Sequence, residues 1–393
     1  MDPTFTARLN RYLEDLNRQG LLRALRVVEP SARGGTRVRI LDGQTEREAV
    51  NFCSNDYLGF AASGRRWKAF QNVETGAGAS RLIGGTRAAH RRFERLAADF
   101  AEKEAAVLFP SGYQANVGTV SALAEVFPRL LSDALNHASL IDGCRLSKGA
   151  VRVVPHLDLE KLEMELAASE EPALLIVEGL YSMDGSVCDF ERLRELKRRR
   201  PFVLLVDEAH ALGTLGPEGK GAAARAGALD LIDVYVGTLG KACGLSGAFV
   251  ASSREVVDWL INRSRAFIFS TAVSPALAEA AAESLQAVRE AQNLRDILAR
   301  RVMRLRTALA DDGVACLGEP FSAIVPVVVG EPRRALAASA ALLERGFFVQ
   351  AIRPPTVPPG TSRLRITVTA LHEDDEVAAL VAALKEVLKQ GKA

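Results

Sequence analysis

Short, continuous apolar runs alternate with helical patterns through the middle of the chain. Four of these runs are VLFP (107–110), ALLIV (173–177), FVLLV (202–206) and VYVG (234–237). Apolar runs without polar alternation are typical of strands that are buried on both faces of a sheet. Because helical patterns separate the runs, we predict an α/β fold with a mostly parallel sheet that is flanked by helices.

The two ends of the chain also carry regular patterns. Residues 275–310, rich in Ala, Leu and Arg, have the period of one long helix. Strand-like runs at 323–329 and 363–370 alternate with helical patterns at 334–346 and 372–390, which predicts a smaller α/β unit. We therefore predict three segments: an N-terminal helix with a short strand segment (1–50), a large domain (51–285) and a small C-terminal α/β domain (286–393).

The composition is that of an ordinary globular protein. Of the 393 residues 48% are apolar and 25% charged, and the formal net charge is +2. This balance gives no electrostatic reason to expect a nucleic-acid or membrane partner. No apolar run reaches about eighteen residues, and the N-terminus lacks the apolar core of a signal peptide. We therefore expect a cytoplasmic protein.

The five cysteines are far apart and form no CxxC or Cys/His metal motif. We therefore expect reduced thiols and no metal site.

Polar side chains follow three consecutive apolar runs near the point where each strand should end. They are Glu178 and Ser182, Asp207 and His210, and Thr238 and Lys241. Because parallel strands end at the same edge of a sheet, we expect these side chains to converge there. Lys241 lies in the glycine-rich stretch YVGTLGKACGLSG, where a lysine amine has room to reach a bound group.

The convergent set suits a pyridoxal phosphate bound to the lysine as a Schiff base. This cofactor needs an acid at its pyridine nitrogen, donors to its ring 3′-oxygen, a flat side chain against the ring, and a helix N-terminus for its phosphate. The candidates are Asp207, His210 with Ser182, His137, and Ser111-Gly112-Tyr113 with Thr238. Each residue also has a structural interpretation, such as a helix cap for Asp207 or a hydrogen-bonded core residue for His137.

A nucleotide-binding alternative has less support. The stretch DEAH (207–210) occurs in ATP-dependent nucleic-acid enzymes, but these need a GxxxxGK[ST] phosphate loop. Neither GTLGKA nor GPEGKG has that spacing or its Ser/Thr. Glycines near 76–85 lack the preceding strand of a dinucleotide-binding turn.

Seven motifs, taken in order, resemble the α-oxoamine synthases, which are pyridoxal-phosphate enzymes of fold type I. They are NFCSNDYLGF, GAGASRLIGGT, LFPSGYQAN, LNHASLIDG, VEGLYSMDG, VDEAHALGTLGPEGKG and TLGKACGLSG. The resemblance covers about residues 5–388. It implies a large domain with a mostly parallel central sheet, a smaller C-terminal α/β domain and an acyltransferase activity.

The resemblance also implies roles for individual residues. Lys241 would carry the cofactor and take the substrate's Cα proton, Asp207 would pair with the pyridine nitrogen, and His137 would stack on the ring and serve as a candidate acid. The remaining cofactor contacts would be Ser111, Gly112, Tyr113, Glu178, Ser182, His210 and Thr238. Ser270 and Thr271 would reach the cofactor phosphate of a neighbouring subunit, which implies a homodimer with shared active sites. The substrate side would include Arg23, Asn55 and Arg353, with Arg365 binding the amino-acid carboxylate.

Within the family, the stretch AIRPPTVPPGTSRLRITVTALHE is most similar to the biotin-pathway branch. That branch condenses L-alanine with a pimeloyl thioester of coenzyme A or acyl carrier protein. The alternatives are a sibling enzyme that uses glycine with acetyl-CoA, another α-oxoamine synthase, or an inactive partner subunit, against which the intact Lys241 argues. The chain departs from the family at His156-Leu157-Asp158, where His-Asn-Asp is usual, and at Ala211 and Cys243.

Overall fold

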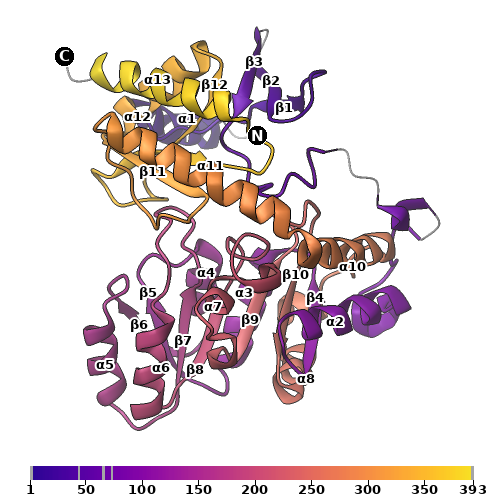
Figure 1. Cartoon of the computed structure of the whole chain (residues 1–393). Coiled ribbons are helices and arrows are strands. Elements are labelled where there is room, and N and C mark those ends of the chain that lie inside the picture. Colours follow the sequence, from indigo (N-terminus) through magenta and orange to yellow (C-terminus); the bar gives the residue numbers. More distant parts are fainter. Residues whose placement is uncertain (1–2, 43–44, 64–66, 72–73, 391–393) are drawn as a thin grey trace. The chain divides into compact units, whose positions relative to one another are not determined.

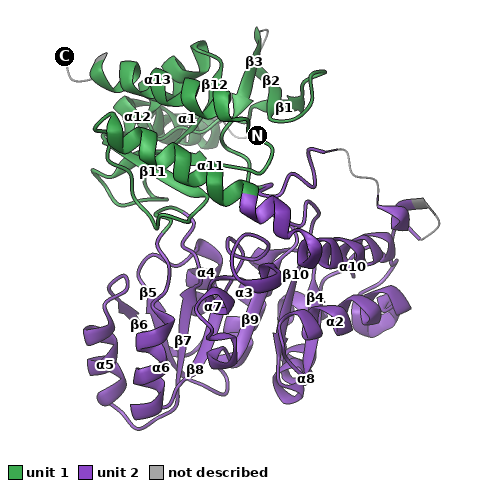
Figure 2. Cartoon of the chain, in the orientation of Figure 1, with its two compact units in different colours: residues 1–55, 183–185, 297–393 green, residues 56–182, 186–296 purple. Residues whose placement is uncertain are grey.

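The computed structural model describes residues 3–42, 45–63, 67–71 and 74–390, and divides the chain into two compact units. Unit 1 comprises residues 1–55, 183–185 and 297–393, and unit 2 comprises residues 56–182 and 186–296 (Figure 2). The three segments 1–50, 51–285 and 286–393 stay a prediction about domains. Unit 1 contains residues from both ends of the chain. This grouping depends on pairing between residues that are far apart in the sequence.

Unit 2 is built on a seven-stranded sheet of order β4-β10-β9-β8-β7-β5-β6 (Figure 1). The strands are β4 (Ala105–Phe109), β5 (Arg129–Asp133), β6 (Ala150–Val154), β7 (Ala173–Glu178), β8 (Val203–Asp207), β9 (Val234–Thr238) and β10 (Ala248–Ser252). All neighbours are parallel except β10, which runs antiparallel to both β4 and β9. The predicted α/β class and mostly parallel sheet are confirmed.

The four predicted strands correspond to β4, β7, β8 and β9, in which nearly every residue is buried. Their continuous apolar sequence follows from this burial, because neither face of a central strand meets water. The edge strand β6 is largely exposed.

Helices pack around this sheet (Figure 1). They are α2 (Ala88–Phe100), α3 (Gly112–Leu123), α4 (Ala138–Leu146), α5 (Leu159–Ala167), α6 (Phe190–Arg199), α7 (Ala222–Arg225), α8 (Arg254–Arg263), α9 (Arg265–Ile268) and α10 (Pro275–Glu290). Several begin at a side-chain cap: Ser111, Asp158 and Asp189 each accept a hydrogen bond from the backbone N–H three residues on.

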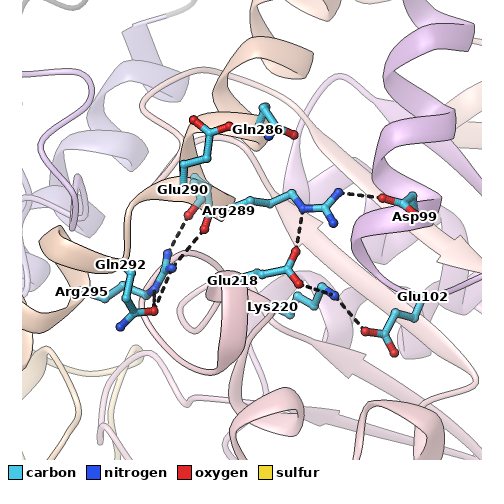
Figure 3. Close-up of polar contacts among 10 residues, drawn as sticks. Asp99, Glu102, Glu218, Lys220, Gln286, Arg289, Glu290, Gln292 and Arg295 are labelled. Atoms are coloured by element: carbon cyan, nitrogen blue, oxygen red, sulfur yellow. Dashed lines mark hydrogen bonds and ion pairs between the residues drawn. The ribbon is translucent and has the colours of Figure 1, made fainter.

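The prediction of one helix over 275–310 is wrong, because the chain breaks at Ala291 into α10 and α11 (Gln292–Asp311). Arg295 donates to the carbonyl of Val288 at 2.6 Å and to that of Arg289 at 3.2 Å (Figure 3). These bonds add donors to carbonyls in the last turn of α10, where the helix runs out of its own N–H groups. A side chain beyond the break therefore stabilises it.

Unit 1 contains two small sheets. One has the order β1-β2-β3-β12, from β1 (Val27–Pro30), β2 (Arg37–Asp42), β3 (Thr45–Asn51) and β12 (Phe347–Phe348). The other has the order β11-β14-β13, from β11 (Ile324–Gly330), β13 (Gln350–Ile352) and β14 (Ser362–Thr367). The helices are α1 (Pro3–Arg18), α12 (Pro332–Glu344), α13 (Asp374–Gln390) and most of α11. β12 pairs with β3, which joins the two chain ends in one sheet.

None of the helices in the described part of the chain combines the length and the apolar character needed to cross a bilayer.

Candidate active site

The carboxyl ends of β7, β8 and β9 hold the central residues of the predicted site. Glu178 pairs directly with Asp207 across β7 and β8, and Asp207 pairs with Val236 of β9, after which the chain reaches Lys241. His137 begins α4 and lies close enough to Asp207 and Lys241 for both charges to act on it. The structure thus brings together residues from four separate segments.

The turn that carries Lys241 depends on glycine. Gly244 has φ +65°, a conformation that other residues adopt only with strain, and its amide donates to the Lys241 carbonyl at 2.8 Å. A Cβ added to Gly244 would lie 2.6 Å from the amide nitrogen of Ala61. The glycines therefore allow a tight turn that also lies against the neighbouring backbone.

The two buried acids differ in their hydrogen bonding. Asp207 accepts from the amide of Ala209 at 2.9 Å and from Nδ2 of Asn116 at 2.6 Å. Burial, reinforced by the negative charge of Asp207, raises the pKa of Glu178 well above its ordinary value. Burial and the neighbouring charge of Asp207 therefore both favour the protonated form of Glu178.

Both histidines of the predicted site have fixed partners. Nδ1 of His210 lies 2.6 Å from the hydroxyl of Tyr57, and both side chains are buried. Nδ1 of His137 accepts from the amide of Ser139 at 3.3 Å and lies 2.7 Å from its hydroxyl. Burial lowers the pKa of His137, Asp207 opposes the shift and Lys241 adds to it.

The N-terminus of α3 forms a second part of the site. Ser111 caps this helix, and its Oγ accepts from the amide of Gln114 at 3.2 Å. Gly112 lies beside Thr238, whose Oγ1 would be 3.5 Å from a Cβ at that position. Ser270 accepts from Nε2 of Gln114 at 3.0 Å. The hydroxyl of Thr238 therefore lies beside a helix N-terminus, an arrangement that suits a phosphate, while Ser270 contacts the Gln114 side chain of the same helix.

Three other residues that were predicted to contact the cofactor each follow a segment of the site described above. Tyr113 follows Gly112 in the first turn of α3, and its hydroxyl bonds the carboxylate of Asp142. Thr271 forms an isolated β-bridge with Ser80. Ser182 is buried four residues after the end of β7.

An ion-pair network holds the loop that follows the DEAH stretch (Figure 3). Glu218 binds Nε of Arg289 at 2.7 Å and Nζ of Lys220 at 3.3 Å, and Lys220 also binds Glu102 at 2.8 Å. Arg289 reaches Asp99 of α2 at 2.7 Å. The network joins α2 and α10 to this loop. The buried carboxyl group of Glu208 binds the end of the same loop.

Glu208 directly follows Asp207 and caps the other end of the same loop. Its two oxygens accept from the amides of Ala222 and Ala223, each at 2.9 Å. Burial raises the pKa of Glu208 to about 7, although these two amides oppose the shift. The turn after β8 is therefore anchored at a carboxyl group whose charged form the protein interior disfavours.

The predicted substrate residues lie in unit 1. Nη1 of Arg365, on β14, donates to Oδ1 of Asn55 at 3.2 Å and to Oγ1 of Thr367 at 3.0 Å. Arg353 donates to the carbonyls of Gly20 and Leu22.

Arg23 donates to Oγ1 of Thr356 at 3.3 Å. A cavity of about 490 Å³ is lined by Arg23 and Arg353 together with apolar side chains such as Leu22 and Ile352. The lining of the cavity therefore combines arginine with aliphatic side chains, and it also includes Asp42.

The departures from the family pattern have structural consequences. Leu157 has φ +54°, in the left-handed region, which Asn tolerates better than Leu. Burial raises the pKa of Cys243 to about 12, which makes its thiol unreactive, and its carbonyl accepts from Ser284. Ala211 is fully buried.

Tyr57, Asn116 and Ser139 make the most informative contacts of the site, and the sequence analysis missed them. Each lies within a motif already quoted, in NFCSNDYLGF, LFPSGYQAN and LNHASLIDG. Their position within these motifs was the sequence signal that could have identified them as site residues.

Residues 47–384 of the chain match the protein family described as aminotransferase class I and II. The chain belongs to the aminotransferase class I and II family. The 8-amino-7-oxononanoate synthase of Geobacter sulfurreducens is 44% identical over 386 residues, covering 96% of this chain and 97% of the relative. That of Burkholderia cenocepacia (strain J2315) is 43% identical over 389 residues, covering 96% and 97%.

Solved structures of the same family share the fold. A serine palmitoyltransferase from S. paucimobilis has a TM-score of 0.89 at 26% identity and full coverage of both chains. An 8-amino-7-oxononanoate synthase from Francisella tularensis has a TM-score of 0.75 at 25% identity, covering 88% of this chain and 99% of the other. The predicted fold type I architecture and the predicted branch of the family are confirmed.

Pyridoxal phosphate is the cofactor of this family, and the residues of unit 2 fit it. A lysine, a buried aspartate that accepts two N–H groups, and a helix N-terminus beside Thr238 are the groups that this cofactor requires.

Proposed function

We propose that the protein catalyses the decarboxylative condensation of L-alanine with a pimeloyl thioester, a step of biotin biosynthesis. The products are 8-amino-7-oxononanoate, CO₂ and the free thiol. The observation that carries this proposal is the group formed by Lys241, Asp207, Glu178 and His137 at the strand ends, in a chain that is 44% identical to a synthase of this name.

The bound pyridoxal phosphate supplies an electron sink for the negative charge that develops at the alanine Cα. Lys241 holds the cofactor and, once alanine has displaced its amine, takes the Cα proton. Asp207 keeps a proton on the pyridine nitrogen, and Asn116 and the Ala209 amide keep its carboxylate in place. Arg365 binds the alanine carboxylate through its guanidinium group, which matches a carboxylate geometrically.

Other residues hold the cofactor in this proposal. The amides of Gly112 and Tyr113 bind the phosphate, with Ser111 and Thr238 adding hydroxyl groups. Ser182 and His210 bind the ring 3′-oxygen, and Tyr57 supports His210 at 2.6 Å.

Ser270 and Thr271 complete the phosphate site of the neighbouring subunit, which makes the active enzyme a homodimer with shared sites.

The acyl donor is a pimeloyl thioester of coenzyme A or of acyl carrier protein. Arg23 and Arg353 line a cavity with apolar walls, a combination that suits a chain with a negatively charged end. The likeness to serine palmitoyltransferase, at 26% identity, supports the shared fold, whereas the identity of 43–44% over the whole chain favours the alanine-dependent branch.

The test is the release of free thiol from pimeloyl-CoA by the cofactor-loaded protein, with L-alanine, glycine and L-serine in parallel. We expect release with L-alanine. Release with glycine alone, or only with acetyl-CoA or a long-chain acyl-CoA, would assign the protein to a sibling branch. Pimeloyl-acyl carrier protein tests the second donor in the same assay.

A further inference from the structure

A chain of hydrogen bonds links Asp207 to His137 through the side chains of Asn116 and Ser139. Nδ2 of Asn116 lies 2.6 Å from Oδ2 of Asp207 and 2.9 Å from Oγ of Ser139. Oγ of Ser139 lies 2.7 Å from Nδ1 of His137. Asn116 is 2% exposed and Ser139 is fully buried, so water does not compete for these bonds.

The chemistry of the groups decides the direction of each bond. The carboxylate of Asp207 can only accept, so the amide group of Asn116 must present its NH₂ to it. The same NH₂ donates to Oγ of Ser139, which leaves the hydroxyl hydrogen of Ser139 for Nδ1 of His137. The backbone amide of Ser139 also points at Nδ1, at 3.3 Å. Two donors therefore converge on Nδ1.

A ring nitrogen that receives two donors carries no proton of its own. The proton of neutral His137 must then lie on Nε2. The titratable groups around the ring come from three segments: Asp207 on β8, Lys241 after β9, and Glu178 on β7, whose carboxyl group accepts from the backbone amide of His137. Burial favours the neutral ring, in agreement with the hydrogen-bond pattern.

We propose that Asn116 and Ser139 are positioning residues that hold His137 as the neutral tautomer protonated on Nε2. In this state His137 presents an N–H donor and no basic nitrogen to the site. Taking up a proton at Nδ1 would oppose the Ser139 amide and break the bond from its hydroxyl. Cα proton removal is therefore left to Lys241, and His137 serves as a donor to oxygen atoms of the substrate; this meaning for catalysis rests on the proposed function.

The experiment is ¹⁵N NMR of full-length protein labelled at histidine, before and after loading with pyridoxal phosphate. The His137 signals are those lost in His137→Asn. The ¹⁵N shifts of the two ring nitrogens report which one carries the proton. In the wild-type protein we expect an unprotonated Nδ1 and a protonated Nε2 from pH 6 to 8.

Two variants test the relay and one serves as a control. Ser139→Ala removes one donor to Nδ1, and loss of one buried hydrogen bond should move the tautomer ratio about fivefold toward Nδ1–H. Asn116→Ala should move it in the same direction, because the Ser139 hydroxyl is then free to turn away. Ser132→Ala is the matched control: Ser132 is also buried and accepts from an asparagine, Asn136, at 3.0 Å, but lies outside this chain of bonds.

The outcomes separate clearly. A wild-type His137 protonated on Nδ1 would overturn the proposal without any variant, and so would a Ser139→Ala spectrum equal to that of the wild type. An equal shift of the His137 tautomer ratio in Ser132→Ala would show that the effect comes from a general loss of packing. A shift in Ser139→Ala without one in Asn116→Ala would remove Asn116 from the relay. The NMR signals do not depend on the substrate, so failure of the thiol-release assay leaves this result intact.

Discussion

Leu157 offers a direct test of how this chain tolerates its departure from the family pattern. Its φ of +54° places it in the left-handed region, which Asn adopts more readily than Leu. An L-residue in this region costs about 1–2 kcal/mol, and Asn is one of the few that adopt it readily. The position cannot relax freely, because the Leu157 amide donates to Asp133 at 3.0 Å and Asp133 also binds His156 at 2.9 Å.

Two replacements separate strain from burial. The Leu157 side chain is half-buried and lines a small pocket together with Leu162 and Leu175, so removing it should cost about 1 kcal/mol. Leu157→Ala loses this contact and keeps most of the strain. Leu157→Asn loses the same contact but relieves the strain. We expect the Asn variant to exceed the Ala variant by about 1 kcal/mol in free energy of unfolding and to equal the wild type within about 0.5 kcal/mol.

Equilibrium unfolding in urea, followed by tryptophan fluorescence, measures this difference. Both tryptophans, Trp67 and Trp259, lie in unit 2 together with Leu157. With a urea dependence of about 2–3 kcal/mol per M, the two variants should differ by about 0.3–0.5 M in midpoint.

Met164 supplies the control, since it lies within α5 and is 64% exposed. There Ala should be more stable than Asn, because Asn is the poorer helix former. If Ala equals or exceeds Asn at position 157 as well, the strain argument is refuted.

Four further results are expected. Lys241→Ala should abolish thiol release while the far-ultraviolet circular dichroism stays unchanged; turnover without added amine would contradict the role of Lys241. Arg365→Ala should raise the KM for L-alanine at least tenfold, and an unchanged KM would remove Arg365 from the substrate site. Because burial raises the pKa of Glu208 to about 7 in the folded protein, folded Glu208 holds its proton more tightly than in the unfolded chain. Its stabilisation is complete below about pH 4.5 and falls by about 3 kcal/mol in all as the pH rises through 7. Urea unfolding at pH 5 and 7.5 should show about 2 kcal/mol of this fall in the wild type, and Glu208→Gln should lack it. Gly179→Ala would place a Cβ 2.6 Å from Cδ of Glu208 and should lower the free energy of unfolding by about 1–3 kcal/mol; a stability equal to the wild type in the same urea measurement would contradict this close approach.

Much of the fold followed from local pattern. The strands β4, β7, β8 and β9 were predicted because their apolar runs are continuous, and α12 and α13 because their periodicity is regular. The strand β6 escaped prediction, since it is an exposed edge strand with a mixed pattern. The break at Ala291 could not be seen either, because it depends on the side chain of Arg295 reaching back to α10.

The sequence alone determined the order of chemical groups along the chain. Asp207 after one apolar run and Lys241 after the next imply one shared edge, because parallel strands must end together. Only the tertiary structure decided how these groups are held. Asn116 and Asp207 are 91 residues apart, and Ser139 reaches His137 only through the turn that begins α4. Hydrogen-bond direction is a property of neighbouring atoms in space, and the proton on His137 is therefore set by folding.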